Sequence, residues 1–221
     1  MEAVLKVGGS LADNLANLAR LCRELSALAE DHRIAVVPGG GEFADTVRKL
    51  DKKYKLSNTV AHKMAILAMD QYGLLLSNIT PNSYVSYSPE EIVNSAEGTL
   101  PIILPSKLLF REDPLKHSWN VTSDTIAAYF AQVLHAENLI LVTDVDGIFP
   151  EDPKKNLDAK LVTELNAEEL LRWNKRTSVD KTLPKMLLEA NRDCHVVNGR
   201  YPERIRLIME NKKTVCTHVT V

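Results

Sequence analysis

The chain has 221 residues, of which 45% are hydrophobic and 25% are charged, and its formal net charge at pH 7 is −2. This is the composition of an ordinary globular protein, so a disordered or fibrous chain is excluded. The near-neutral charge gives no basic field for nucleic acid, and no apolar run approaches the roughly 20 residues of a membrane span, so we expect neither partner.

Short apolar runs alternate with helical periods in the first half of the chain. Ala3–Val7 predicts a buried strand, and the leucine spacing that follows predicts a helix over Asn14–Glu30. The next expected elements are a strand at Ile34–Val37, helices at Glu42–Lys53 and within Ser57–Ser77, a helix start at Ser88-Pro89-Glu90-Glu91, and a strand at Ile102–Leu104.

The second half continues the same alternation, and three stretches lack a regular pattern. The expected elements are a helix at Thr125–Leu134, strands at Leu139–Thr143 and Lys160–Thr163, helices at Asn166–Trp173 and Leu183–Ala190, a strand at His195–Val197, a helix over Pro202–Glu210 and a strand at Thr217–Val221. The irregular stretches are Asn78–Tyr87, Pro105–Asn120 and Phe149–Leu157. Nearly continuous apolar strands with helices between them predict an α/β fold, a three-layer αβα sandwich with a mostly parallel sheet, in a single domain over residues 1–221.

The cysteine pattern points to a reducing compartment. The chain has three cysteines, Cys22, Cys194 and Cys216, which are far apart in the sequence. An odd number of cysteines, together with an N-terminus that does not resemble a signal peptide, favours free thiols and a cytoplasmic protein.

Glycine-rich loops follow the first two predicted strands. The first strand leads into Lys6-Val7-Gly8-Gly9-Ser10, and the second leads into Pro38-Gly39-Gly40-Gly41. Such loops let backbone N–H groups approach an anion, and the helices after them would direct their positive ends into the same crevice. Two tight strand-to-helix turns without a ligand remain the alternative. A lysine in a buried strand needs a polar partner, and Lys6 therefore favours the anion site.

Carboxylates and a late lysine stand out in the second half. Asp144 and Asp146 follow the most apolar strand, and Asp152-Pro153 comes shortly after them; Asp152 could equally serve a turn. Asp124 precedes an apolar helix, where capping the helix is the alternative role. Lys185 follows Pro184 near a helix start, where the helix dipole disfavours a lysine unless an anion binds there; an ordinary surface lysine is the alternative.

These residue types suit phosphoryl transfer. The reaction needs positioning, positive charge and amide donors around the transferred group rather than covalent help from the protein. The Gly39-x-Gly41-x-x-Ala44 match to a dinucleotide fingerprint is weak, because no strand with an acidic end follows at the required distance. The six histidines have no metal-ligand spacing, so we expect no metal site formed by the protein alone.

The order of the motifs resembles the amino acid kinase superfamily, which includes acetylglutamate kinase, aspartokinase, uridylate kinase and isopentenyl phosphate kinase. The motifs that carry the resemblance are Lys6-x-Gly8-Gly9-Ser10, Gly39–Gly41, Asn120-x-x-Ser123-Asp124, Thr143-Asp144-x-Asp146-Gly147 with Asp152-Pro153, and Lys185. The resemblance covers the whole chain. It implies ATP and Mg²⁺ as cofactors, a homo-oligomer, an acceptor-binding half over about residues 1–135 and a nucleotide-binding half over about residues 136–221.

The resemblance also implies a role for each motif residue. Lys6 and Lys185 would stabilise the transferring phosphoryl group, and Asp124 would hold the lysines in position. The phosphate and acceptor would be bound by Gly8, Gly9, Ser10, Gly39, Gly40, Gly41, Asn120 and Ser123. The nucleotide pocket would be lined by Thr143, Asp144, Asp146, Gly147, Phe149, Asp152 and Pro153.

Longer segments narrow the resemblance to the methanofuran-biosynthesis kinase group, which forms the diphosphate of [5-(aminomethyl)furan-3-yl]methyl phosphate with ATP. Those segments are Ala61–Gly73, Ser118–Asp124, Val179–Lys185 and Val197–Arg204. Such an acceptor carries a phosphate and an ammonium group, and Glu42, Asp45 or Asp70 could meet the ammonium. The alternatives are a kinase of the same fold with a carboxylate, carbamate, isopentenyl phosphate or nucleoside monophosphate acceptor, and a non-catalytic protein that binds a nucleotide or oxyanion.

Overall fold

One eight-stranded sheet forms the centre of the computed structural model, which describes all residues 1–221. The strand order is β3-β4-β2-β1-β5-β7-β8-β6, and all neighbours are parallel except β7 and β8. The strands are β1 Ala3–Val7, β2 Ile34–Pro38, β3 Ser83–Ser86, β4 Leu100–Ile103, β5 Asn138–Thr143, β6 Glu164–Asn166, β7 Cys194–Asn198 and β8 Thr217–Thr220.

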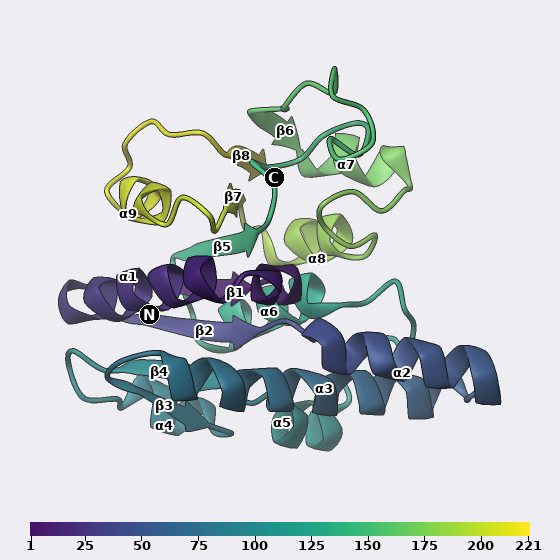
Figure 1. The fold of residues 1–221 in the computed structure, drawn as a ribbon, viewed down its shortest axis with the longest axis horizontal. Helices are drawn as coiled ribbons and strands as arrows, with labels where there is room; N and C mark the ends of the chain where they lie inside the picture. Colours follow the sequence, from purple (N-terminus) through teal and green to yellow (C-terminus); the bar gives the residue numbers. More distant parts are fainter.

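Helices cover both faces of the sheet, as Figure 1 shows. They are α1 Leu15–Asp31, α2 Gly41–Tyr54, α3 Asn58–Ile79, α4 Pro89–Val93, α5 Ser106–Glu112, α6 Ser123–Val133, α7 Ala167–Trp173, α8 Leu183–Ala190 and α9 Glu203–Met209, with a short 3-10 helix, η1, at Gly9–Asp13. None of these helices is both long and apolar enough to cross a membrane.

The central strand β1 shows why the strands are apolar throughout. Side chains alternate between the two faces of a strand. Ala3, Leu5 and Val7 therefore pack with α1 and α9, while Val4 faces the other way and packs with α6 and α8. Both faces are buried, which confirms the predicted αβα sandwich. The same alternation directs the side chain of Lys6 toward the face that α6 covers.

Most predicted elements are present within a few residues of their predicted ends. Asn14 caps α1 by accepting a hydrogen bond from Asn17, and Ser57 caps α3 in the same way. Ser88 accepts from the N–H of Glu91 at the start of α4, as the sequence predicts. The three cysteines are free thiols.

Three expectations about the irregular stretches and weak strands need correction. The sequence does not predict β3 or α5, which lie in Asn78–Tyr87 and Pro105–Asn120. The strand expected at Lys160–Thr163 is wrong: those residues make a single bridge, from Val162 to Ile148, and the strand is β6, which follows them. Leu165 explains the shift, because it is the buried residue between exposed Glu164 and Asn166.

Candidate active site

A cavity of about 510 Å³ opens at the carboxyl ends of β2, β1 and β5, which are neighbours in the sheet. β2, the next strand in the chain, pairs with one edge of β1, and β5, which comes much later, pairs with the other edge. In open α/β sheets, ligands bind at such a reversal of strand order, because the loops after the two neighbouring strands separate there. The loops after all three strands line this cavity.

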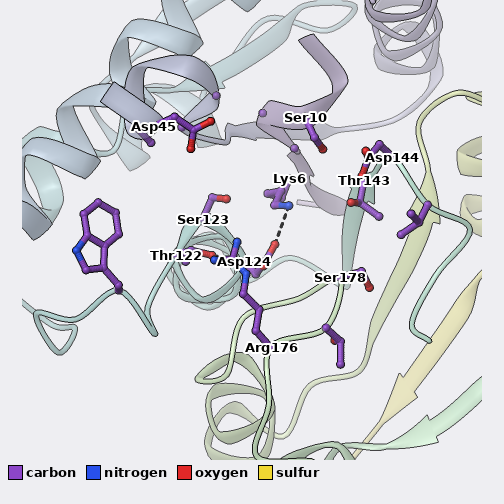
Figure 2. A pocket seen from close by; sticks show the side chains of 18 of the residues that line it. Lys6, Ser10, Asp45, Thr122, Ser123, Asp124, Thr143, Asp144, Arg176 and Ser178 are labelled. Atoms are coloured by element: carbon purple, nitrogen blue, oxygen red, sulfur yellow. Dashed lines mark hydrogen bonds and ion pairs between the residues drawn. The ribbon is translucent and has the colours of Figure 1, made fainter. Parts of the chain in front are cut away.

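A buried ion pair lies at the centre of the cavity. Lys6 Nζ is 2.7 Å from Asp124 Oδ1, and the two side chains are only 7% and 6% exposed. Figure 2 shows this pair between the loop that holds Ser10 and the start of α6. Asp124 does not cap α6, because Thr122 occupies the cap position. The carboxylate instead faces the lysine, so helix capping is not its role in this structure.

The two glycine loops touch one another beside this pair. A Cβ on Gly9 would lie 2.2 Å from the backbone nitrogen of Gly41, and Gly41 itself has a φ of +51°. Side chains at these two positions would therefore separate the loops or strain the turn. Gly8, Gly9 and Ser10 line the cavity together with the start of α2, whose N–H groups are a favourable environment for an anion.

The loop after β5 forms one end of the cavity. Five residues expected at a nucleotide pocket line it: Thr143, Asp144, Phe149, Asp152 and Pro153. Lys154, which the sequence analysis did not single out, makes an ion pair with Asp144. Burial alone would raise the pKa of Asp144, but the hydrogen bond and charge of Lys154 outweigh burial and hold that pKa below its usual value. Arg176 is a second lining cation that the sequence analysis missed.

The opposite end of the cavity combines an apolar wall with a fixed guanidinium group. Ala65, Ile66 and Met69 of α3 form part of the wall. The Arg48 guanidinium lies 4.9 Å from the centroid of the Trp119 ring and 2.6 Å from Asp45 Oδ1. Cation–π contact and the ion pair therefore hold Arg48 in place before any ligand binds.

His62 adds a buried imidazole to this end of the cavity. The residue is 8% exposed, and its ring stacks on that of His117 with the centroids 4.8 Å apart. Burial and the neighbouring His117 lower the pKa of His62, which disfavours the charged form of its imidazole. No periodic or motif signal distinguishes it from a core histidine, and only the fold reveals that it lines the cavity.

Several residues named from the sequence lie outside the cavity lining. Asp146 accepts hydrogen bonds from Arg204 at 2.6 Å and from Asn198 at 3.1 Å. Lys185 is 66% exposed and lies 3.4 Å from Glu189. Gly39 packs behind Gly9, Gly147 packs against Thr217, and Asn120 is exposed with its carbonyl bonded to Thr182. The structure thus gathers Lys6, Gly8, Gly9, Ser10, Gly40, Gly41, Ser123, Asp124, Thr143, Asp144, Phe149, Asp152 and Pro153 at the cavity.

Asp70 needs a specific correction, because it is one of the three carboxylates that could meet an ammonium group. Its side chain is buried and does not line the cavity. The backbone N–H and the hydroxyl of Ser106 both donate to it. Glu42 and Asp45 do line the cavity, and Glu42 has no ion-pair partner there. Glu42 and Asp45 therefore remain the candidates for binding the ammonium group, and Asp70 does not.

Known proteins resemble this chain over most of its length. Residues 1–198 match the amino acid kinase family model. The chain is 35% identical over 216 residues to the [5-(aminomethyl)furan-3-yl]methyl phosphate kinase of Methanocaldococcus jannaschii, covering 98% of this chain and 96% of that protein. It is 28% identical to a uridylate kinase of Pyrococcus abyssi over 77% of this chain and 75% of the relative.

Solved structures share the fold. The uridylate kinase of Archaeoglobus fulgidus superposes with a TM-score of 0.77 over 100% of both chains, at 21% identity. The UMP kinase of Ureaplasma parvum gives a TM-score of 0.78 at 19% identity, covering 100% of this chain and 99% of the other. At these identities the likeness speaks for the architecture alone.

Proposed function

This chain belongs to the amino acid kinase family and is a phosphotransferase, and from that premise we propose that it transfers the γ-phosphoryl group of ATP to [5-(aminomethyl)furan-3-yl]methyl phosphate, forming the diphosphate. The observation that carries this proposal is the buried Lys6–Asp124 pair, which lies where the two glycine loops meet inside one cavity. The similarity to the kinase from Methanocaldococcus jannaschii supports the choice of acceptor.

In the proposed reaction, an oxygen of the acceptor phosphate attacks the γ-phosphorus of ATP. The new P–O bond forms as the bond to the β–γ bridging oxygen breaks, and ADP leaves with that oxygen. The chain's own part is to bind, orient and neutralise charge. Lys6 would contact the transferring group, with Asp124 keeping its ammonium in place and the amides near Gly9 and Gly41 donating hydrogen bonds. Lys185 is proposed as the second cation.

Mg²⁺ fits the residues of the cavity as a companion of the nucleotide. No cluster of three or more metal-ligating side chains exists, but Mg²⁺ in kinases is typically held by one or two carboxylates together with substrate phosphates and water. Asp144 and Asp152 line the cavity and would be the carboxylates. The bound ion would neutralise charge on the phosphate oxygens.

We propose that the two ends of the cavity divide the substrates. The loop after β5 and the 176–178 segment, both within residues 136–221, would bind ATP. The α2 and α3 end, within residues 1–135, would bind the acceptor, with Arg48 near its phosphate and the apolar wall along its ring.

We further propose a homo-oligomer, for which the exposed Leu67, Leu74 and Leu75 of α3 offer an apolar face.

Asp144 provides a test of this division. Asp144→Asn should raise the KM for ATP more than the KM for the acceptor, because the side chain lies at the proposed nucleotide end and loses its charge beside Lys154. Steady-state kinetics with each substrate varied in turn will measure both constants. A change confined to the acceptor KM would show that the two ends have been assigned the wrong way round.

The acceptor's amine provides a second test. The aminomethyl compound should have a higher kcat/KM than its hydroxymethyl analogue, because the bound acceptor would cover a carboxylate that is exposed in the free protein. Glu42 has no ion-pair partner and would be left unsatisfied by the analogue, whereas Asp45 would keep its contact with Arg48. Leaving such a group unsatisfied costs about 1–3 kcal/mol. Glu42→Gln and Asp45→Asn, each assayed with both compounds, will show which carboxylate carries the preference. Equal kcat/KM values in the unaltered protein would count against this acceptor, though not against kinase activity.

The proposed function is tested most directly by ADP release in a coupled assay. The acceptors to compare are [5-(aminomethyl)furan-3-yl]methyl phosphate, uridylate, isopentenyl phosphate and acetylglutamate. The first should give the highest kcat/KM. Uridylate is the informative competitor, because the relatives that cover three quarters or more of the chain include uridylate kinases. ATP binding without ADP release for any acceptor would favour a non-catalytic nucleotide-binding protein.

A further inference from the structure

Asp180 is a buried carboxylate that the proposed mechanism does not use. It lies just before α8, is 2% exposed, and accepts six hydrogen bonds. Oδ2 accepts from Thr122 N at 2.9 Å, Thr122 Oγ1 at 3.0 Å and Thr125 N at 3.0 Å. Oδ1 accepts from Thr125 Oγ1 at 2.6 Å, Thr182 N at 3.0 Å and Leu183 N at 2.8 Å.

These six donors come from the starts of two helices. Thr122 and Thr125 belong to the cap and first turn of α6, and Thr182 and Leu183 belong to the start of α8. Neither helix has a capping side chain of its own at its cap residue. Unpaired N–H groups at a helix start need an acceptor, and a negative charge there is stabilised by the helix dipole. One side chain thus ties both helix starts together.

The backbone of Asp180 continues the connection to the ion pair. Its N–H donates to Asp124 Oδ2 at 3.0 Å, while Asp124 Oδ1 contacts Lys6 Nζ and no other polar group. Thr122 Oγ1 also lies near Asp124 Oδ2, but at 3.5 Å, so the orientation of the Asp124 carboxylate depends mainly on where the backbone of Asp180 lies. The six hydrogen bonds to the Asp180 side chain fix that backbone position.

Asp180 is stabilised by its own hydrogen bonds and not by an ion pair with Lys6. Burial and the nearby charge of Asp124 raise the pKa of Asp180, and the hydrogen bonds to its side chain act in the opposite direction. Lys6 is the only ammonium group that forms an ion pair with either acid, and its partner is Asp124. Because six donors solvate Asp180, Lys6 is not shared between the carboxylates and stays directed at Asp124.

We propose that Asp180 is a positioning residue for phosphoryl transfer. Acting through Asp124, it holds the Lys6 ammonium in the orientation that the transferring group requires, and it fixes the start of α8, which carries Lys185. This inference rests on the proposed kinase function, but not on the identity of the acceptor. A donor misplaced by a small distance loses much of its effect on a transition state.

Asp180→Asn tests the inference, because the amide NH₂ would face donors where an oxygen now accepts. We expect kcat to fall at least about tenfold, with the KM for ATP changing less than about threefold; this pattern marks an interaction that acts in the transition state. Asp70→Asn is the matched control. It alters another buried carboxylate, one held only by Ser106 and lying outside the cavity, so it should destabilise the fold and leave kcat unchanged.

A second readout does not depend on turnover. The rate of Lys6 acetylation by acetic anhydride, followed by peptide mass spectrometry, should rise several-fold in Asp180→Asn and not in Asp70→Asn, because the ammonium would no longer be held against Asp124. Thr125→Val removes one donor while keeping the side-chain shape, and it should shift kcat and labelling in the same direction by less. It serves in place of Asp180→Asn if that variant does not fold.

The outcomes separate the inference from the proposed function. If wild-type protein phosphorylates none of the acceptors, the proposed function fails, and Lys6 labelling still decides whether Asp180 positions the lysine. If folded Asp180→Asn, or Thr125→Val in its place, keeps both the wild-type kcat and the wild-type labelling rate, Asp180 is a structural tie only and the inference is overturned.

Discussion

Lys6→Met should lower kcat by about 10²- to 10³-fold while ATP still binds within about tenfold of the wild-type affinity. The size of the effect follows from removing one preorganised charge at a site where negative charge shifts in the transition state. Such a group raises kcat more than it tightens ground-state binding. Single-turnover transfer from labelled ATP will measure the chemical step, and nucleotide binding will be measured separately by calorimetry.

The same substitution should also destabilise the fold, because the Lys6 side chain is 7% exposed and is paired with a carboxylate side chain that is 6% exposed. Removing one partner of a buried ion pair leaves an uncompensated charge and costs about 3–5 kcal/mol. Denaturant unfolding of Lys6→Met will show the loss. The effect on catalysis must therefore be separated from the effect on folding.

Lys6→Met combined with Asp124→Asn makes this separation. The double variant no longer buries the Asp124 charge without its ammonium partner, so its stability should recover much of the loss seen in Lys6→Met. Its kcat should not recover, because the ammonium is still missing. Recovery of both properties together would show that Lys6 is a structural lysine and that the cavity does not use it for transfer.

Local sequence was enough to predict most of the fold and several residues at the centre of the cavity. The strands are apolar throughout because both of their faces are covered, as Val4 and Leu5 show on β1. Lys6 could be singled out because a charge within such a strand demands a partner. The glycine loops could be found because their backbone contact, from Gly9 to Gly41, tolerates no side chain.

Residues whose roles depend on distant partners could not be found in this way. Asp180 accepts hydrogen bonds from Thr122 and Thr125, which are more than 50 positions away in the chain. The sequence around Asp180 is typical of an ordinary helix start. His62 has the spacing of a core residue on α3, yet it lines the cavity. Asp146 was placed in the pocket by resemblance, whereas in the structure its partners are Arg204 and Asn198.

Lys185 differs from Lys6 in its position. The order of the motifs selects both lysines, but only Lys6 lines the cavity, and the ammonium of Lys185 lies outside it. Its side chain is 66% exposed and pairs with Glu189, one turn further along α8. The start of α8 is nevertheless joined to the start of α6 through Asp180. The start of α8 is therefore tied to the start of α6, and the role proposed for Lys185 would require its ammonium to turn from Glu189 toward the cavity.

Lys185→Met should accordingly lower kcat by about 10²- to 10³-fold with little change in stability, since an exposed ion pair contributes only about 0–1 kcal/mol to folding. Lys181→Met and Glu189→Gln are the matched controls: the first removes an exposed lysine one turn earlier, and the second removes the partner of Lys185. Both should retain kcat within about threefold.

The effects of Lys6→Met and Lys185→Met should be less than additive, because groups that act on one transition state work as a unit. A wild-type single-turnover rate in Lys185→Met would identify it as a surface lysine. Lys154 and Arg176, which already line the cavity, would then be the cations to substitute next.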